Sequence, residues 1–359
     1  MLRYVTKRLL YGLLVLLGVV TLVFFLFNIL PGDPARMMLG QRADEESIAL
    51  INRDLGRDRP VMVQFAGYLG DLLPISLHNN ADPESFFYLS ADKYDYVTLL
   101  RISSTSLVLK KPYLRRSYQS QRKVSEIIAT AFPQTALLAV VAMLFALLVG
   151  ISLGVVSALH KDSWIDRTTL VLSTLGMSLP SFFAAILIAW LFAYVLADWT
   201  GLNMFGNLYS VDDYGDGEYL DLKNLILPAL TLGIRPLATL TQLTKNAMLE
   251  ALSQDYIRTA RAKGLSHRRV VVRHALRNAL NPVVTSASGW LASLLAGAVF
   301  VEYVFDWKGM GIVIVDALDT YDFPVVMGAI LFICVLLVVI NILTDLLYAA
   351  LDPRVRLAN

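Results

Sequence analysis

Long uninterrupted apolar runs are the feature that most constrains how this chain folds. The first run extends over residues 9–30 and is broken only by Thr21 and Asn28. A hydrocarbon layer about 30 Å thick is crossed by roughly 20 apolar residues of helix. Hydrophobic residues make up 56% of the chain and charged residues 17%, which is more apolar surface than a soluble core of this length buries. The chain is therefore expected to be a membrane protein.

The first apolar run has two interpretations, a cleaved signal peptide or a membrane anchor. Arg3, Lys7 and Arg8 precede it, as basic residues precede the apolar part of a signal peptide. The run is longer than that part usually is, and no small-residue cleavage site follows it. The sequence favours the anchor.

Five further runs are long and apolar enough to be considered as membrane spans. They are residues 135–159, 168–196, 225–244, 282–301 and 323–343, the last running on toward residue 350. The expected fold class is therefore an all-α membrane protein with six transmembrane helices.

The basic residues that flank these runs indicate which way the helices point, because short cytoplasmic loops carry an excess of Lys and Arg. With the N-terminus inside, the loop at 245–277 is cytoplasmic and holds eight basic residues. The two short outside loops, 199–224 and 303–322, contain only Lys223 and Lys308 as basic residues, against many acids. Both termini are therefore predicted to be cytoplasmic.

The polar segment at 31–126 follows the first run and is also rich in Lys and Arg. Long loops are translocated largely regardless of their charge, so this segment is predicted to be an extracytoplasmic insertion between the first two spans. Residues 43–55 and 61–73 have apolar residues at helical spacing and predict two short amphipathic helices. Residues 96–100 and 105–109 are candidate strands.

These features predict three divisions of the chain. They are the cytoplasmic N-terminus with the first span at 1–30, the extracytoplasmic segment at 31–126, and a five-helix core at 127–359 that contains a cytoplasmic loop at 245–281.

Composition argues against several functions. The net charge of +2 is too small for a nucleic-acid-binding protein. The single cysteine, Cys334, lies in an apolar run, so neither a disulfide framework nor a cysteine-rich metal site is expected. The sequence has no Gly-x4-Gly-Lys-Ser/Thr loop and no His-Glu-x2-His pair, and its four histidines are scattered. Neither enzymatic activity nor a metal site is therefore predicted.

The loop at 245–281 has the clearest local structure of the polar segments. Residues 249–263 are good helix formers without a breaker. Gly264 suits the left-handed position that ends a helix, and Ser266 is suited to cap the next one. Pro282 opens the next span. The loop is predicted to form a helix, a sharp turn and a second helix.

One face of the first of these helices is a candidate docking surface. Tyr256, Ala260 and Lys263 lie on it at helical spacing, and the small Ala260 side chain permits another surface to approach closely. The alternative is that the basic residues only contact anionic lipid headgroups. That alternative accounts for most of the charges but not for the turn at Gly264.

Two stretches of the loop are Asp255-Tyr-Ile-Arg-Thr-Ala-Arg-Ala-Lys-Gly264 and Arg273-His-Ala-Leu-Arg-Asn-Ala-Leu-Asn-Pro282. Together they resemble the permease loop of ATP-binding-cassette importers in the dipeptide/oligopeptide/nickel family. The order of shorter matches adds to the resemblance. These matches are at residues 30–35, 68–71, 179–181, 227–233 and 352–354.

In that family the loop is a coupling helix that sits in a cleft of the ATPase subunit. Carried over by position, the resemblance implies that the contact is formed by Tyr256, Arg258, Thr259, Ala260, Gly264 and Leu265. Arg258 and Thr259 stand where the broader superfamily has Glu and Ala, a variation that resembles the peptide branch.

The resemblance also implies the partners and the location. Two ATP-binding-cassette ATPase subunits would bind ATP and Mg, with no cofactor in this chain. A second, related permease would complete the path, and an extracytoplasmic substrate-binding protein would deliver the cargo, in a bacterial inner membrane. Di- or oligopeptides are the favoured cargo, while nickel chelates and oligosaccharides stay open. The alternative from a different class is a secondary transporter driven by an ion gradient, which would be expected to carry acids near the midplane.

Arg235 is the one charge in the middle of a predicted span, and it is a candidate to line the substrate path. The alternatives are that it pairs with a neighbouring helix, or that Pro236 opens the helix and lets it reach water. Pro180 and Pro236 are candidate helix kinks. Small residues at 150, 154 and 158 predict close helix packing.

Residues 74–116 depart from the family pattern and are predicted to be an insertion of about 40 residues, well beyond ordinary connections. The insertion would either contact a binding protein or lipoprotein, or brace the outer face.

Overall fold

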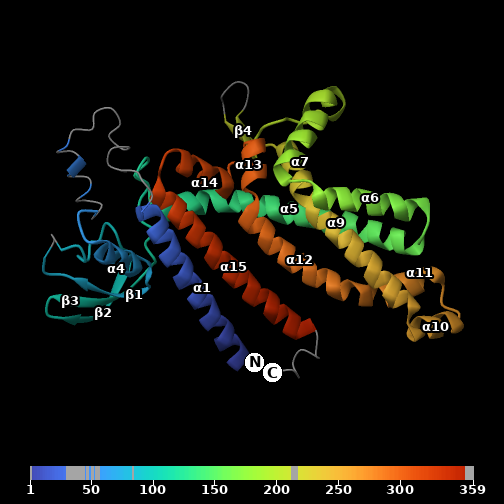
Figure 1. The fold of residues 1–359 in the computed structure, drawn as a ribbon, viewed down its shortest axis with the longest axis horizontal. Helices are drawn as coiled ribbons and strands as arrows, with labels where there is room; N and C mark the ends of the chain where they lie inside the picture. The colour runs from blue at the N-terminus through green and yellow to red at the C-terminus, as the bar shows by residue number, and fades with distance from the viewer. Residues whose placement is uncertain are drawn as a thin grey trace. The chain divides into compact units, whose positions relative to one another are not determined.

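The computed structural model describes residues 2–29, 45, 48–49, 52, 57–82, 85–211 and 217–351, and this part of the chain is mostly helical (Figure 1). The helices are α1 (Leu2–Ile29), α4 (Val61–Leu72), α5 (Val124–Leu159), α6 (Trp164–Ser178), α7 (Ser181–Ile188), α8 (Ala197–Thr200), α9 (Lys223–Ser253), α10 (Asp255–Ala262), α11 (His267–Arg269), α12 (Arg277–Gly297), α13 (Val299–Phe305), α14 (Met310–Asp319) and α15 (Phe323–Leu351), with π-helical segments η2 (Ala189–Val195) and η3 (Val270–Leu276).

The described chain is mostly helical, as expected, but it also contains five short strands, so it is not all-α. β1 (Ile75–Asn79), β2 (Tyr96–Ile102) and β3 (Thr105–Lys110) form an antiparallel sheet in the order β1-β3-β2. β4 (Tyr209–Val211) pairs with β5 (Glu218–Leu220). β2 and β3 confirm the two candidate strands, whereas β1 was not predicted.

Four helices are long and apolar enough to cross a membrane: residues 6–28 of α1, α5, α9, and residues 323–345 of α15. Two further spans result if each of two bent helix pairs is counted as one. Trp164–Ser178 and Ser181–Val195 meet at 112°, and His267–Leu295 and Val299–Phe305 meet at 57°. The described residues therefore hold four to six spans by length and composition.

Pro180 marks a break in the third predicted span that is larger than the expected kink. It precedes α7 as its N-cap, and Leu179 before it is extended, with φ −71° and ψ 129°. A proline disfavours helical geometry in the preceding residue, so α6 ends there. Pro236, in contrast, lies inside α9, which continues on both sides of it.

Three predictions fall wholly or mostly outside the described residues. They are the first amphipathic helix at 43–55 and the family motifs at 30–35 and 352–354. The second amphipathic helix, predicted at 61–73, is confirmed by α4.

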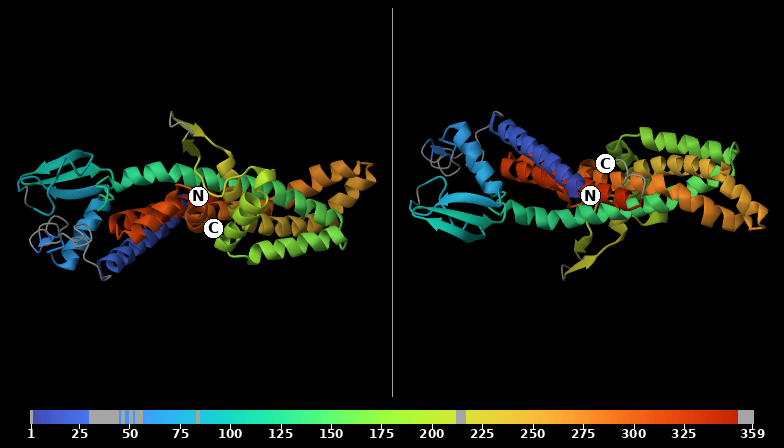
Figure 2. Two further views of the ribbon diagram at one scale, coloured as in Figure 1. Left: turned by 90° about the horizontal axis from the view of Figure 1, so that it is seen from above. Right: turned by 90° about the horizontal axis from the view of Figure 1, so that it is seen from below.

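The described chain divides into two compact units. The first comprises residues 1–12, 131–312 and 333–359, and the second comprises residues 13–130 and 313–332. In the first unit, α9 contacts both α6 and α12 (Figures 1 and 2). In the second, Asp322 binds the turn that follows the sheet: its carboxylate accepts hydrogen bonds from the Ser117 hydroxyl at 2.5 Å and the Tyr118 N–H at 2.9 Å.

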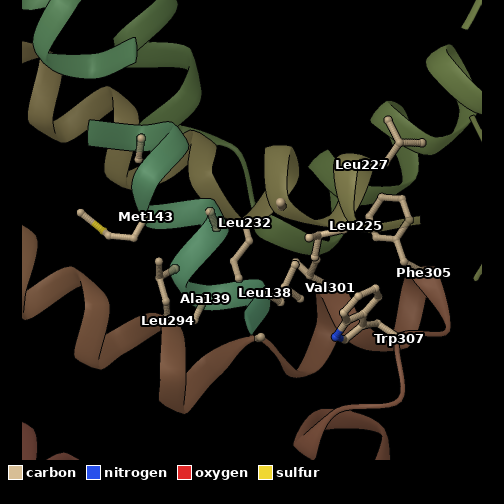
Figure 3. Close-up of a cluster of buried hydrophobic side chains, with 14 of the residues drawn as sticks. Leu138, Ala139, Met143, Leu225, Leu227, Leu232, Leu294, Val301, Phe305 and Trp307 are labelled. Atoms are coloured by element: carbon tan, nitrogen blue, oxygen red, sulfur yellow. The ribbon is translucent and has the colours of Figure 1, made fainter. Parts of the chain in front are cut away.

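The core of the first unit is a cluster of large apolar side chains. Five of its side chains are at most 2% exposed: Leu138 of α5, Leu227 of α9, Val301 and Phe305 of α13, and Trp307. Figure 3 shows these side chains meeting in one cluster. Within a membrane, lipid tails are as apolar as leucine, so close packing rather than the hydrophobic effect holds such helices together.

Small residues bring α5 and α9 close together, as predicted. A Cβ added at Gly154 would lie 2.6 Å from the carbonyl oxygen of Thr241, and one added at Gly150 would lie 3.0 Å from that of Leu237. Ala158 is 4% exposed. The contact depends on the absence of side chains on this face of α5.

A buried carboxylate fastens α13 and α14 to α5. Glu302 is fully buried, and it accepts hydrogen bonds from the Thr135 hydroxyl at 2.6 Å and from the Gly311 N–H at 2.5 Å. The Met310 N–H donates in turn to the Thr135 oxygen at 2.8 Å. A Cβ at Gly309 would lie 2.5 Å from the carboxylate. The network thus holds a loop between two helices, with no basic side chain among the residues that hydrogen-bond to Glu302.

The first turn of α9 is fixed by Asn224, which is 6% exposed. Its side-chain nitrogen donates to the Asn207 carbonyl at 2.9 Å and the Ser210 hydroxyl at 3.2 Å, and its side-chain oxygen accepts from Asn203 at 2.9 Å. The segment leading into the β4–β5 hairpin is therefore tied to this end of α9.

Candidate functional site

The corner between α9 and α11, residues 254–266, holds the residues predicted to contact a partner and is called the α10 corner. The sequence predicts one helix over residues 249–263, but α9 ends at Ser253 and α10 begins at Asp255. Gln254 between them is extended, with φ −73° and ψ 150°. The chain therefore changes direction before α10, which stands as a separate short helix.

Gly264 ends α10 in the left-handed conformation, as predicted, with φ +78°. Its N–H donates to the Arg261 carbonyl at 2.9 Å, and the Leu265 N–H donates to the Ala260 carbonyl at 3.3 Å. Ser266 occupies the N-cap position of α11, but its side chain makes no capping hydrogen bond. The predicted N-cap position of Ser266 is therefore confirmed, but the predicted capping hydrogen bond is wrong.

A small apolar cluster holds the α10 corner to the rest of the first unit. Ile257 and Ala260 of α10 pack with Met248 of α9 and with Val270 and Val271 of η3. Ile257, Met248 and Val270 are fully buried. Because one face of α10 is packed in this way, the corner is expected to move as a rigid body with the end of α9.

The burial of Ala260 corrects the expected docking face. Ala260 is 6% exposed and faces the chain's own core, so the predicted stripe of Tyr256, Ala260 and Lys263 is not a single exposed face. Ala260 lies on the face that also carries Ile257, one turn away. Its small side chain lets η3 approach α10.

The other predicted contact residues lie on the surface of the corner. Tyr256 is 39% exposed, Arg258, Thr259 and Gly264 are also exposed, and Leu265 is half-buried. Arg258 forms an ion pair with Asp255 at 3.5 Å, but both side chains are exposed, so the pair adds little stability. The charge and hydrogen-bonding capacity of Arg258 are thus open to a partner.

A buried ion pair that the sequence analysis missed braces the helix leading into the corner. Lys245 Nζ of α9 lies 2.5 Å from Asp166 Oδ1 of α6. The same carboxylate accepts hydrogen bonds from the Ser157 hydroxyl at 2.5 Å and the Asp162 N–H at 3.1 Å. The sequence gives no signal of this pair, because Lys245 and Asp166 lie far apart along the chain.

Lys245→Met is expected to lower the free energy of unfolding, because it leaves the Asp166 carboxylate buried without its cation. The expected loss is roughly 2 kcal/mol, between the losses typical of breaking an exposed and a buried ion pair. Thermal unfolding of the purified protein measures the effect. The double variant Asp166→Asn/Lys245→Met should regain part of the loss. Equal stability of the single variant and the wild type would contradict the brace.

Arg235 lies on α9 and is exposed, and it makes no ion pair with any residue that the structure describes. Pro236 next to it is buried. No group of three potential metal ligands occurs among the described residues.

Four long apolar helices and two bent helix pairs define a multi-span membrane protein, and the α10 corner at the end of α9 presents an exposed surface. Comparison with known proteins identifies its family. Residues 150–357 match the model of the binding-protein-dependent transport system inner membrane component, and residues 1–81 match that of the N-terminal region of such components. The chain belongs to this family, and it is the permease subunit of an ABC importer in the bacterial inner membrane.

Relatives align over nearly their whole length. The chain is 35% identical to a putative peptide permease protein of Brucella suis and 36% identical to the glutathione transport system permease protein GsiC of Salmonella typhimurium, with 99% of each chain covered. It is 33% identical to the dipeptide transport system permease protein DppB of Alkalihalophilus pseudofirmus, covering 99% of this chain and all of that one. ATPase activity in this family resides in separate subunits.

Among solved structures, a chain of the MetNI methionine ABC transporter in an inward-facing form has a TM-score of 0.51 and 17% identity, covering 64% of this chain and 97% of that one. At this identity the similarity concerns the fold alone.

Residues 74–116, predicted to be an insertion, carry the three-stranded sheet of β1, β2 and β3 in the part that the structure describes.

Proposed function

We propose that the chain is the permease of an importer for di- or oligopeptides, in which it forms half of the translocation path. The observation that supports this cargo is the alignment over nearly the full length with permeases named for peptides, dipeptides and glutathione. Nickel chelates and oligosaccharides are the alternative cargoes. The two halves of the path are this chain and a second, related permease.

The proposed topology has six spans, with both termini cytoplasmic and residues 31–126 outside. Arg8 Nε near the start of α1 lies 3.0 Å from Asp345 Oδ2 near the end of α15, which supports placing the two chain ends on one side of the membrane. The eight basic residues at 245–277 support placing the α10 corner on the same, cytoplasmic side. The bent pairs count as one span each in this topology.

The proposed mechanism is alternating access driven through the α10 corner. ATP binding closes a dimer of two ATPase subunits, each of which receives a coupling helix from one permease. In this chain the contact is formed by the exposed Tyr256, Arg258 and Thr259 with Gly264 and Leu265, while Ala260 supports them from inside. The apolar cluster under α10 then transmits the displacement to α9. An extracytoplasmic binding protein delivers the peptide.

The cargo is tested by purifying the complete transporter with its binding protein and identifying the ligand that co-purifies by mass spectrometry. A peptide is the expected result. A nickel chelate or an oligosaccharide would replace the peptide proposal but leave the permease assignment intact.

Arg235 is proposed to line the path and to meet the peptide carboxylate. Arg235→Gln is expected to raise the KM for peptide uptake about tenfold, because it removes one charge-assisted hydrogen bond to the peptide carboxylate. Lysine at this position, which keeps the charge, should have a smaller effect. An unchanged KM in the glutamine variant, at normal expression, would exclude Arg235 from the path.

A further inference from the structure

A cavity of about 320 Å³ lies in the second compact unit. α4 contributes Gly70 and Asp71 to its lining, β1 contributes His78, and the segment after β3 contributes Arg115 and Arg116. Small-molecule sites in proteins typically have volumes of about 300–1,000 Å³. The cavity therefore has room for a ligand of amino-acid to dipeptide size.

Positive side chains outnumber negative ones around this cavity. Lys93, Arg115 and Arg116 line it, and Asp71 is the one carboxylate among its lining residues. The Asp71 carboxylate is already engaged, since it accepts a hydrogen bond from the Tyr94 hydroxyl at 2.6 Å and forms an ion pair with Arg115 at 3.2 Å. Lys93 and Arg116 remain as net positive charge.

Arg116 has hydrogen-bonding capacity to spare. Its guanidinium donates to the carbonyl oxygens of Gln121 at 3.2 Å and Asp92 at 3.5 Å, and it also hydrogen-bonds the Tyr113 hydroxyl. Neither Arg116 nor Lys93 forms an ion pair with a residue that the structure describes. A guanidinium has five N–H donors in a planar fork that fits a carboxylate.

The remaining lining is aromatic and uncharged. Phe86 and Phe87 contact each other edge to face, as do Tyr94 and Tyr113, and all four line the cavity. Burial raises the pKa of both tyrosines, so neither ring adds a negative charge, and the Tyr94 hydroxyl is already engaged with Asp71. Burial lowers the pKa of His78, so its ring is neutral there and adds no charge.

We propose that this cavity binds a small carboxylate-bearing molecule with an aromatic or apolar body. Arg116 and Lys93 hold the carboxylate, and the phenylalanine and tyrosine rings cover the body. Lys93 and Arg116 are exposed at the cavity, so a carboxylate gains charge-assisted hydrogen bonds that a neutral ligand lacks, and an inorganic anion would leave the rings uncovered. The site lies outside the α10 corner, and the proposal does not rest on the cargo of the importer.

The test uses the full chain in detergent micelles, with N-acetylphenylalanine as the probe and its uncharged amide as the control, and measures binding by calorimetry. The acid is expected to bind at least about tenfold more tightly than the amide. Arg116→Gln should weaken binding of the acid about tenfold. Lys111→Gln is the matched control, because Lys111 is 83% exposed, pairs with Asp95 and does not line the cavity; it should leave binding unchanged.

A second variant blocks the cavity without removing any charge. A Cβ added at Gly70 would meet no atom within 4 Å, and leucine is a better helix former than glycine, so Gly70→Leu should fold and fill the space. Binding of the acid should then be lost.

Three results would overturn the proposal. One is equal affinity for acid and amide, or wild-type affinity in both variants. Another is displacement of the acid by inorganic phosphate of equal affinity, which would indicate a site for any anion. The third is that the wild-type chain does not bind the acid, while Arg116→Gln weakens its association with the substrate-binding protein. This result would indicate that an acidic side chain of the binding protein occupies the cavity.

Discussion

Valine in place of Gly264 is expected to reduce peptide uptake about tenfold or more, with the protein still present in the membrane. Gly264 has φ +78°, and a left-handed conformation costs an ordinary residue roughly 1–2 kcal/mol, more when the side chain is β-branched. A Cβ there would meet no atom within 4 Å, so the strain lies in the backbone and not in a clash. The valine variant should therefore open the α10 corner while leaving the core intact.

Two control variants separate coupling from general strain. Asparagine tolerates the left-handed conformation, so Gly264→Asn should retain most of the uptake. Gly201 is also left-handed, with φ +59°, and also has open space around it, so Gly201→Val imposes similar strain away from the α10 corner. Uptake and retention of the ATPase subunits during purification are measured for all three. Normal values for both in Gly264→Val would remove the support for coupling through this corner.

Alanine in place of Glu302 is expected to lower the free energy of unfolding by roughly 3 kcal/mol, which corresponds to a fall of roughly 5–10 °C in the unfolding temperature. The substitution leaves the Gly311 N–H and the Thr135 hydroxyl without their acceptor and opens a cavity at a fully buried position. The loop between α13 and α14 then loses its attachment to α5. Thermal unfolding of the solubilised protein, followed by size-exclusion chromatography, measures the loss.

The matched control for this substitution is Glu250→Ala, because Glu250 is an exposed acid on α9. It should change the unfolding temperature little. Gly309→Ala is an independent test, since its Cβ would lie 2.5 Å from the Glu302 carboxylate and displace it. A Glu302→Ala variant as stable as Glu250→Ala would show that the buried network contributes nothing.

The long helices and the turn at Gly264 were predictable because their signals are local. An apolar run of more than 20 residues, as in α1 and α15, has few alternatives to a span. A glycine that follows a helical stretch and is followed by a serine is typical of a left-handed helix end. β2 and β3 were found from their β-branched and apolar residues.

The missing elements depend on contacts between distant residues. The buried positions of β1 are Ser76 and His78, so the strand lacks the usual pattern of buried apolar and exposed polar residues. The 112° bend at Pro180 lies in a stretch that is apolar on both sides, and composition alone does not distinguish a kink from a break. The sequence gives no signal for the buried Glu302, because its partners Thr135 and Gly311 lie on other elements.

Ala260 shows the same limit within the candidate site. Helical spacing places Tyr256 and Ala260 near one another, but it does not say which side of the helix the rest of the chain will cover. That choice is made by Val270 and Val271 of η3, which pack under α10. The exposed half of the predicted set could be assigned only once the fold was known.

The continuity of α9 has a mechanical consequence. It is one rod of 31 residues, roughly 46 Å long, with the α10 corner at its last turn and the Asn224 anchor of the β4–β5 hairpin at its first. Under the proposed coupling, a displacement of the α10 corner is transmitted to the Asn224 end along this one continuous helix, without a relay of side chains.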